Sequence, residues 1–323
     1  MLKLFAGLIF FTTLLFGERI VTPSASIEVN GTAKDLVLAG SHLVIGTDSG
    51  RLQVYDYVQK RFVKEITVPK IKDFTGEVIP AAVFSVDYID GRYLLLSDSG
   101  EGGYSNLWLH ENNRTIQLLS PKDKCPLIKA RFVDRDHILF GYLSNEAALY
   151  DIKTRKELYR EQLSPSKFSD FALNEDRTKA AYGCESGVIS VIRVSDGKLI
   201  RNLEGINKDN VYKVDIKRDI VVGAGQDRRG SIYDLKSGKG DFIQGSFLIY
   251  AAALSPSAGR VAFALDENNN ISVFKRETKE KIALLKGQKS TLNVIVFKDE
   301  NTLFSASDDS SVMMWNIKKE EKR

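Results

Sequence analysis

The chain has 323 residues, of which 43% are hydrophobic, 27% charged and 10% aromatic, with 24 Gly, 7 Pro and 2 Cys. This composition supports a large buried core and excludes a disordered chain, a collagen-like chain and a small disulfide scaffold. Lys and Arg number 46 against 42 Asp and Glu, so the net charge does not indicate a nucleic-acid-binding protein.

Residues 1–17 have the pattern of a secretory signal peptide. Lys3 precedes thirteen uncharged, mostly apolar residues that end at Phe16, and the charged pair Glu18 and Arg19 follows Gly17. A helix of that length spans only about 20 Å, whereas the hydrocarbon core of a bilayer is about 30 Å thick. We therefore expect cleavage after Gly17 or near Ala25, a periplasmic location, no stable membrane anchor after cleavage and no nucleic-acid partner.

The rest of the chain repeats a unit that ends in a short apolar strand containing an aromatic residue or its equivalent. This residue falls at Tyr55, Trp108, Tyr150, Ile192, Tyr233, Phe274 and Trp315. Successive spacings are 53, 42, 42, 41, 41 and 41 residues. The long first interval indicates an insertion at residues 69–80 (PKIKDFTGEVIP).

Each unit is predicted to contain four short strands joined by turns. In the sixth unit the predicted strands are residues 248–254, 260–265, 271–276 and 281–285. No segment of useful length has the helical period of 3.6, which excludes a βαβ architecture. Residues 188–194 (VISVIRV) are apolar almost throughout, as expected when both faces of a sheet pack against neighbouring sheets.

These repeats resemble the WD40 family of β-propellers. The pairs Tyr55-Asp56, Tyr150-Asp151, Tyr233-Asp234 and Trp315-Asn316 stand where that family places Trp-Asp. Residues 46–50 (GTDSG) and 305–309 (SASDD) match its second strand and following turn. The resemblance spans residues 33–317 and implies an all-β, seven-bladed propeller that forms one domain over residues 18–323. The Gly-His pair that opens family repeats is absent, so the family's His-Ser-Asp-Trp hydrogen-bond network is not carried over.

The seventh unit lacks its fourth strand, because only the short polar tail of residues 318–323 follows it. Residues 19–31 precede the first complete unit and include Ile20, Val21, Ile27 and Val29. We expect this segment to pair as the outer strand of the seventh blade and so to close the ring between the two chain ends.

The sequence contains few side chains suited to catalysis or metal binding. Cys125 and Cys184 are predicted on one face in neighbouring blades, where a disulfide is conceivable but two separate thiols are favoured. His42, His110 and His137 are predicted in solvated turns on the opposite face, without the spacing of metal ligands. Nucleophile-elbow, phosphate-loop and haem-attachment motifs are absent. We therefore expect no enzymatic activity, no catalytic residues, no metal and no cofactor.

The loops on the face that carries the insertion form the predicted partner-binding surface, because loops at one end of a rigid scaffold often bind partners. The insertion itself is the first contact candidate, and the alternative is a flap that folds onto its own blade. The candidate contact residues on this face are Lys70, Lys72, Phe74, Lys122, Lys124, Arg228 and Arg229.

An exported single-propeller chain of this kind resembles the NapL type of accessory protein associated with periplasmic nitrate reductase systems. The resemblance rests on overall architecture and implies a non-enzymatic interaction protein whose partners are periplasmic nitrate reductase subunits. One alternative is an outer-membrane assembly scaffold, although the Cys needed for lipid attachment is missing. Another is a lactonase-like or cofactor-binding propeller enzyme, because residues 188–198 (VISVIRVSDGK) resemble a lactonase-like surface repeat.

Overall fold

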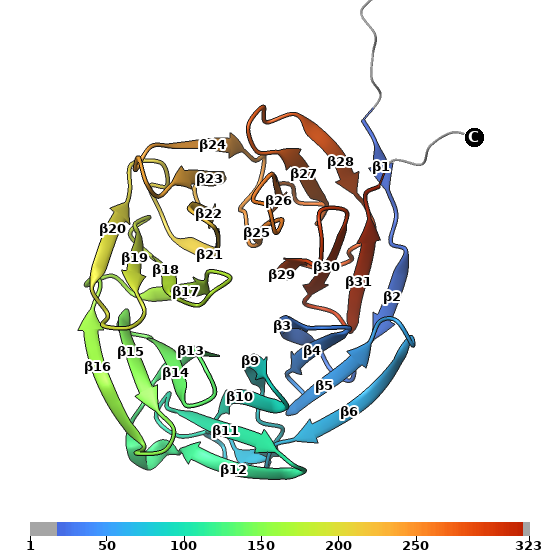
Figure 1. The fold of residues 1–323 in the computed structure, drawn as a ribbon. Helices are drawn as coiled ribbons and strands as arrows, with labels where there is room; N and C mark the ends of the chain where they lie inside the picture. The colour runs from blue at the N-terminus through green and yellow to red at the C-terminus, as the bar shows by residue number, and fades with distance from the viewer. Residues whose placement is uncertain (1–17, 319–323) are drawn as a thin grey trace, which may run out of the picture.

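The computed structural model describes residues 18–318 as a ring of β-sheets around a central axis (Figure 1). Seven sheets form the blades, and each predicted repeat supplies strands to one of them. The only helical element between residues 18 and 318 is the 3-10 turn η1 (Pro121–Asp123). The prediction of an all-β, seven-bladed propeller is therefore confirmed. The predicted signal peptide, residues 1–17, and most of the polar tail lie outside the described residues.

In each blade four antiparallel strands follow one another outward from the axis. Blade 1 consists of β3 (Ala33–Ala39), β4 (His42–Thr47), β5 (Arg51–Asp56) and β6 (Arg61–Thr67). Blade 2 consists of β9 (Val83–Ile89), β10 (Arg92–Asp98), β11 (Ser105–Glu111) and β12 (Arg114–Leu119). Blade 3 consists of β13 (Leu127–Phe132), β14 (His137–Tyr142), β15 (Glu146–Asp151) and β16 (Lys156–Gln162). Blade 4 consists of β17 (Phe168–Leu173), β18 (Lys179–Cys184), β19 (Ile189–Arg193) and β20 (Leu199–Leu203).

The remaining three blades complete the circle. Blade 5 consists of β21 (Val211–Lys217), β22 (Ile220–Gly225), β23 (Arg229–Asp234) and β24 (Gly240–Gln244). Blade 6 consists of β25 (Ala252–Leu254), β26 (Arg260–Ala264), β27 (Ile271–Lys275) and β28 (Lys281–Leu285), with β1 (Ile20–Val21) added at its edge. Blade 7 consists of β29 (Leu292–Phe297), β30 (Thr302–Ser307), β31 (Ser311–Asn316) and β2 (Ala25–Glu28).

The hydrophobic core lies between the blades. It consists of seven clusters, and each cluster joins side chains of two neighbouring blades. The repeated aromatic positions lie in the third strand of every blade and pack in the cluster shared with the preceding blade. Trp315, for example, is fully buried against Ala262 and Leu285 of blade 6. A single blade therefore has no core of its own.

The ring closes through the N-terminal segment, as predicted. Strand β2 pairs antiparallel with β31, with Ile27 opposite Val312, and Ile27 and Val29 are buried in the cluster shared by blades 7 and 1. The prediction that Ile20 and Val21 belong to this outer strand is wrong. They form β1, which pairs in parallel with β28 of blade 6. Pro23 lies between β1 and β2 and has no backbone N–H to donate, so the pairing breaks where the chain crosses from one blade to the next.

The insertion between blades 1 and 2 forms a short hairpin of β7 (Ile71–Lys72) and β8 (Val78–Ile79). The Asp73 carboxylate holds its turn by accepting the backbone N–H groups of Thr75 and Glu77. Ile71 packs on the core between blades 1 and 2. Gly100, in the loop between β10 and β11 with φ of 76°, lies directly against the hairpin backbone. The base of the insertion is thus anchored, whereas Phe74 at its tip is 98% exposed.

The two halves of the N-terminal segment should differ in their contribution to stability. Ile27 is 3% exposed and Ile20 is 56% exposed, so Ile27→Ala should lower the free energy of unfolding by about 2–5 kcal/mol. Ile20→Ala should lower it by less than about 1 kcal/mol. Urea unfolding of both variants tests this, and equal effects would contradict ring closure through β2.

Candidate functional site

The predicted partner-binding residues lie on one face of the ring. Because consecutive strands run in opposite directions, the connections between blades and the turns between second and third strands lie at the same end. The hairpin β7–β8, the turn η1 and the β22–β23 turn therefore share a face, which we call the insertion face. Lys70, Lys72, Lys122 and Lys124 on this face are exposed.

The structure brings only some of these residues near one another. Lys70, Lys72 and Phe74 belong to one hairpin, and η1 occupies the next connection around the ring. Arg228 and Arg229 lie in blade 5, away from the insertion. Arg229 donates a hydrogen bond to the Ile206 carbonyl and stacks on Phe242, whereas Arg228 is exposed. The hairpin thus brings together three of the predicted residues, Lys70, Lys72 and Phe74.

The two cysteines are separate, buried thiols. Cys125 receives a contact from the Tyr142 hydroxyl, and burial raises the pKa of its thiol. Cys184 lies beside the hydroxyl of Ser186. The prediction of two separate thiols is therefore confirmed. The desolvated Cys125 thiol is a poor nucleophile.

The histidines do not meet. His42 and His137 lie beside aspartates, namely Asp56 and Asp134. His110 was expected in a solvated turn, but it is buried in β11 next to Thr115, and burial together with the Lys64 charge lowers its pKa. Within residues 18–318, no group of three His, Cys, Asp or Glu side chains is arranged to hold a metal ion.

A second polar site lies at the axis of the ring and was not predicted from the sequence. Six of the seven inner strands have a β-bulge, and the residues that follow the bulges are Asp35, Ser85, Lys129, Asp170, Lys213 and Val294. A bulge re-aims the side chain that follows it, and all of these residues except Ser85 line one central cavity. The sequence does contain a signal for this site. Charged residues such as Lys129 and Asp170 recur at the repeat length in inner strands that are otherwise apolar.

The aspartates of this site link neighbouring blades. Asp35 of blade 1 accepts the backbone N–H of Val86 in blade 2 at 2.8 Å. The same contact recurs three times, each directed to the inner strand of the following blade. The recurring pairs are Asp87 with Phe132, Asp170 with Val214, and Asp215 with Leu254. These four aspartates therefore have a structural role, since each joins two neighbouring blades.

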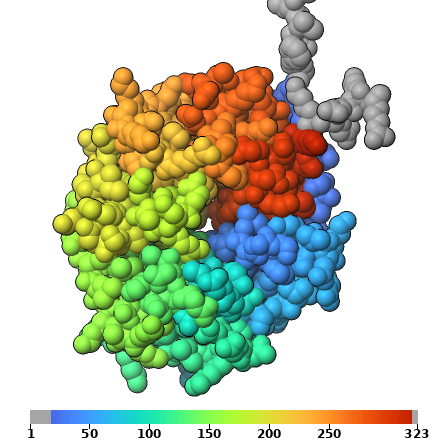
Figure 2. Space-filling view, viewed as in Figure 1, coloured from blue at the N-terminus to red at the C-terminus, as the bar shows by residue number. Residues whose placement is uncertain are grey.

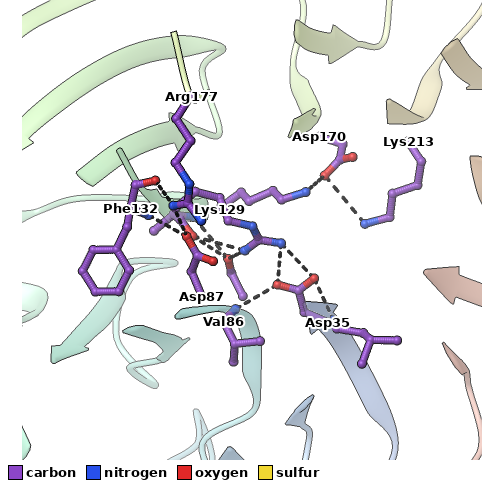
Figure 3. Close-up of polar contacts among 12 residues, drawn as sticks. Asp35, Val86, Asp87, Lys129, Phe132, Asp170, Arg177 and Lys213 are labelled. Carbon is purple, nitrogen blue, oxygen red and sulfur yellow. Dashed lines mark hydrogen bonds and ion pairs between the residues drawn. The ribbon is translucent and has the colours of Figure 1, made fainter. Parts of the chain in front are cut away.

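Cations pair with the same carboxylates (Figure 3). Arg131 lies 2.8 Å from Asp35, Lys129 lies 2.6 Å from Asp170, and Arg177 lies 3.0 Å from Asp87. Lys213 approaches the same Asp170 oxygen as Lys129, at 3.7 Å. These ion pairs join different blades. Asp35, for example, belongs to blade 1 and Arg131 to blade 3.

Burial and charge have opposite effects on these groups. Burial raises the pKa of Asp35, but the charges of Arg131, Lys129 and Lys213 outweigh it and hold the pKa below the usual range. Burial lowers the pKa of Lys129 to about 8; Asp170 opposes this shift, and Arg131 and Lys213 add to it. The Lys129 ammonium therefore loses its proton at a lower pH than an ordinary lysine does.

The cavity that these residues surround has a volume of about 330 Å³, and Figure 2 shows a narrow opening at the centre of the ring. Its charged side is formed by inner strands of blades 3, 4 and 5 together with Asp35 and Asp87. Its other side is apolar and includes Val37, Val294 and Val296. Asn174, Glu175 and Arg177 line it where β17 turns into β18, which is the end of the ring opposite the insertion face.

Comparison of the chain with protein-family models finds no match, and comparison with curated proteins finds no significant similarity. The seven-bladed arrangement is consistent with the WD40-like fold that the repeats resemble. Among residues 18–318, no helix is long and apolar enough to cross a membrane.

Removing the negative charge of Asp35 should destabilise the ring, because the mostly buried Arg131 guanidinium would lose its partner. At pH 7, Asp35→Asn should lower the free energy of unfolding by about 3–5 kcal/mol. The folded pKa of Asp35 lies below its unfolded value, so its contribution is complete above about pH 4 and is lost as the pH falls further. Chemical denaturation from pH 7 to pH 2 measures both effects.

The matched control is Asp241→Asn, which removes an exposed ion pair with Lys279. It should cost less than about 1 kcal/mol at pH 7. A difference between Asp35→Asn and the wild type that stays constant down to pH 2 would contradict the electrostatic account.

Lys129 should make the folded state more stable as the pH rises above 8. Its folded pKa of about 8 lies below the ordinary lysine pKa of 10.5, so between these values the unfolded chain binds more protons. The wild type should therefore gain stability relative to Lys129→Met from pH 8 to pH 10, measured by chemical denaturation. A stability difference independent of pH over this range would show that burial does not perturb Lys129.

Proposed function

We propose that this chain is an exported, non-enzymatic scaffold that binds a protein partner through the insertion face. The propeller fold fits an interaction role, because a closed ring holds its loops in fixed positions. The single observation that carries the proposal is the hairpin β7–β8, whose base is anchored in the core and whose tip presents Phe74 to solvent.

The hairpin exposes apolar side chains of the kind that lie at the centre of protein interfaces. Phe74 is 98% exposed and Val78 is 57% exposed, and exposed aromatic side chains often contribute much of the binding energy when a partner buries them. Because the Asp73 carboxylate fixes the turn, little conformational entropy is lost when the tip is bound.

Charges of both signs lie on and around the hairpin. Lys70 and Lys72 lie on its first arm, Asp73 and Glu77 lie in its turn, and Lys122 and Lys124 lie beside Asp123 in the next connection around the ring. Exposed charges of this kind mainly set the rate and the selectivity of association. We therefore expect a partner with an apolar pocket surrounded by charges complementary to these.

We further propose that this partner is a subunit of a periplasmic nitrate reductase. This step rests on the resemblance of the chain to NapL-type accessory proteins and on the predicted export signal in residues 1–17. The role would be to support the maturation, assembly or electron supply of the reductase.

Changing the hairpin should abolish partner capture without changing the fold. Phe74→Ser combined with Lys70→Glu and Lys72→Glu should weaken binding of the purified partner at least about tenfold, measured by calorimetry or surface plasmon resonance. The matched control is Leu158→Ser on the outer strand β16, which is 56% exposed and should bind like the wild type. Unchanged affinity of the hairpin variant would show that the insertion is not the contact.

The partner's identity is tested separately. The wild-type protein, isolated with a tag from the periplasm, should co-purify with nitrate reductase subunits, and deletion of its gene should slow nitrate reduction. Rescue should require the wild-type hairpin. If the reductase is not captured and nitrate reduction is unaltered, the nitrate reductase assignment is wrong even if another partner binds the hairpin.

A further inference from the structure

The central cavity has two chemically different sides. On β21 the position after the bulge is Lys213, paired with Ala224. On β29 the equivalent position is Val294, paired with Ala306. Val37 and Val296 extend the apolar side, whereas Lys129 and Asp170 extend the charged side. A cavity with a charged side and an apolar side suits a ligand that has a polar head and an apolar body.

The carboxylate oxygens of Asp35, Asp170 and Asp215 are engaged, whereas lysine donors remain. The oxygens of Asp170 meet the Val214 N–H and the Lys129 ammonium. Both oxygens of Asp35 and of Asp215 likewise accept hydrogen bonds. An ammonium group carries three N–H donors. Between residues 18 and 318, the only hydrogen bond donated by the Lys129 ammonium goes to Asp170, and the Lys213 ammonium makes only an ion pair of 3.7 Å.

The two ammonium groups therefore share a single carboxylate (Figure 3). Lys129 and Lys213 approach the same oxygen of Asp170, so neither ammonium group has a carboxylate of its own in contact. The carboxylate of a ligand would pair with both. Such a charge in a partly buried site is favourable only when hydrogen-bond donors meet it, and the ammonium groups supply those donors.

The size and access of the cavity fit a small ligand. Its volume of about 330 Å³ lies at the lower end of the range for small-molecule sites. The residues Asn174, Glu175 and Arg177 of the β17–β18 turn line the cavity, so it reaches the end of the ring opposite the hairpin.

We propose that the central cavity binds a small organic carboxylate with an apolar body. Lys213 and Lys129 receive the carboxylate beside Asp170, and the apolar body lies against Val294 and Val296. This site is independent of the proposed protein partner, because it uses none of the hairpin residues.

Hexanoate is the probe for this site, with hexan-1-ol as the neutral analogue, acetate as the analogue without the apolar body, and inorganic phosphate as a purely polar anion. Calorimetric titration of the full mature chain should show the tightest binding for hexanoate. Hexan-1-ol, acetate and phosphate should each bind at least about tenfold more weakly. Equal binding of hexan-1-ol would overturn the role of the lysines, and equal binding of phosphate or acetate would overturn the role of the apolar side.

Variants locate the site. Lys213→Met should weaken hexanoate binding at least about tenfold, and Lys213→Gln, which keeps a polar side chain, provides a second variant should the first be unstable. Val294→Ser should weaken binding of hexanoate but not of acetate. The matched control is Lys198→Met, which removes an exposed lysine of blade 4 with a side chain 73% exposed and should leave binding unchanged. Wild-type affinity in folded Lys213 variants would overturn the proposal.

Proton uptake gives a readout that a merely structural lysine would not change. Because the Lys129 pKa is about 8, a bound carboxylate should raise it and draw a fractional proton from the buffer at pH 8. The apparent binding enthalpy of hexanoate should therefore depend on the ionisation enthalpy of the buffer. The absence of this dependence at pH 8 would contradict contact between the carboxylate and Lys129.

Discussion

The rest of the structure depends on the packing of each blade against its two neighbours. All seven core clusters join two blades, so the removal of one blade exposes apolar surface on both sides of the gap. The seventh blade would be incomplete without β2, which provides the strand that the seventh repeat lacks. The hydrophobic effect thus makes the ring, rather than the blade, the unit of stability.

A second constraint acts at the axis. Seven inner strands converge there, and their side chains cannot all be large and apolar without filling the channel. In this protein five of the inner strands contribute charged residues, whose aspartates bond to the backbone of the next blade. Buried ion pairs contribute little net stability compared with apolar packing. Their arrangement around a cavity of about 330 Å³ fits the proposed carboxylate site.

The sequence predicted the ring well because the repeat reflects packing. Tyr150, Ile192 and Tyr233 are regularly spaced because each makes the equivalent contact with the preceding blade. The alternation within a strand is a local property, so it can be recognised in the sequence. The division of the N-terminal segment at Pro23 was missed because the apolar residues on both sides suggested one continuous strand. The axial site was missed because the alternation of apolar and polar residues indicates only which side chains of a strand share a face. It does not indicate that the inner strands of seven blades meet at one axis. His110 was misplaced because its burial depends on Lys64 and Thr115 of other strands.

The most direct measurement of the central claim is scanning calorimetry of residues 18–323, comparing the calorimetric enthalpy of unfolding with the van't Hoff enthalpy. If every core is shared between blades, the ring unfolds as one unit, and the two enthalpies agree within error in a single transition. Several separable transitions, or a calorimetric enthalpy several times the van't Hoff value, would mean that groups of blades are stable alone and would contradict the account.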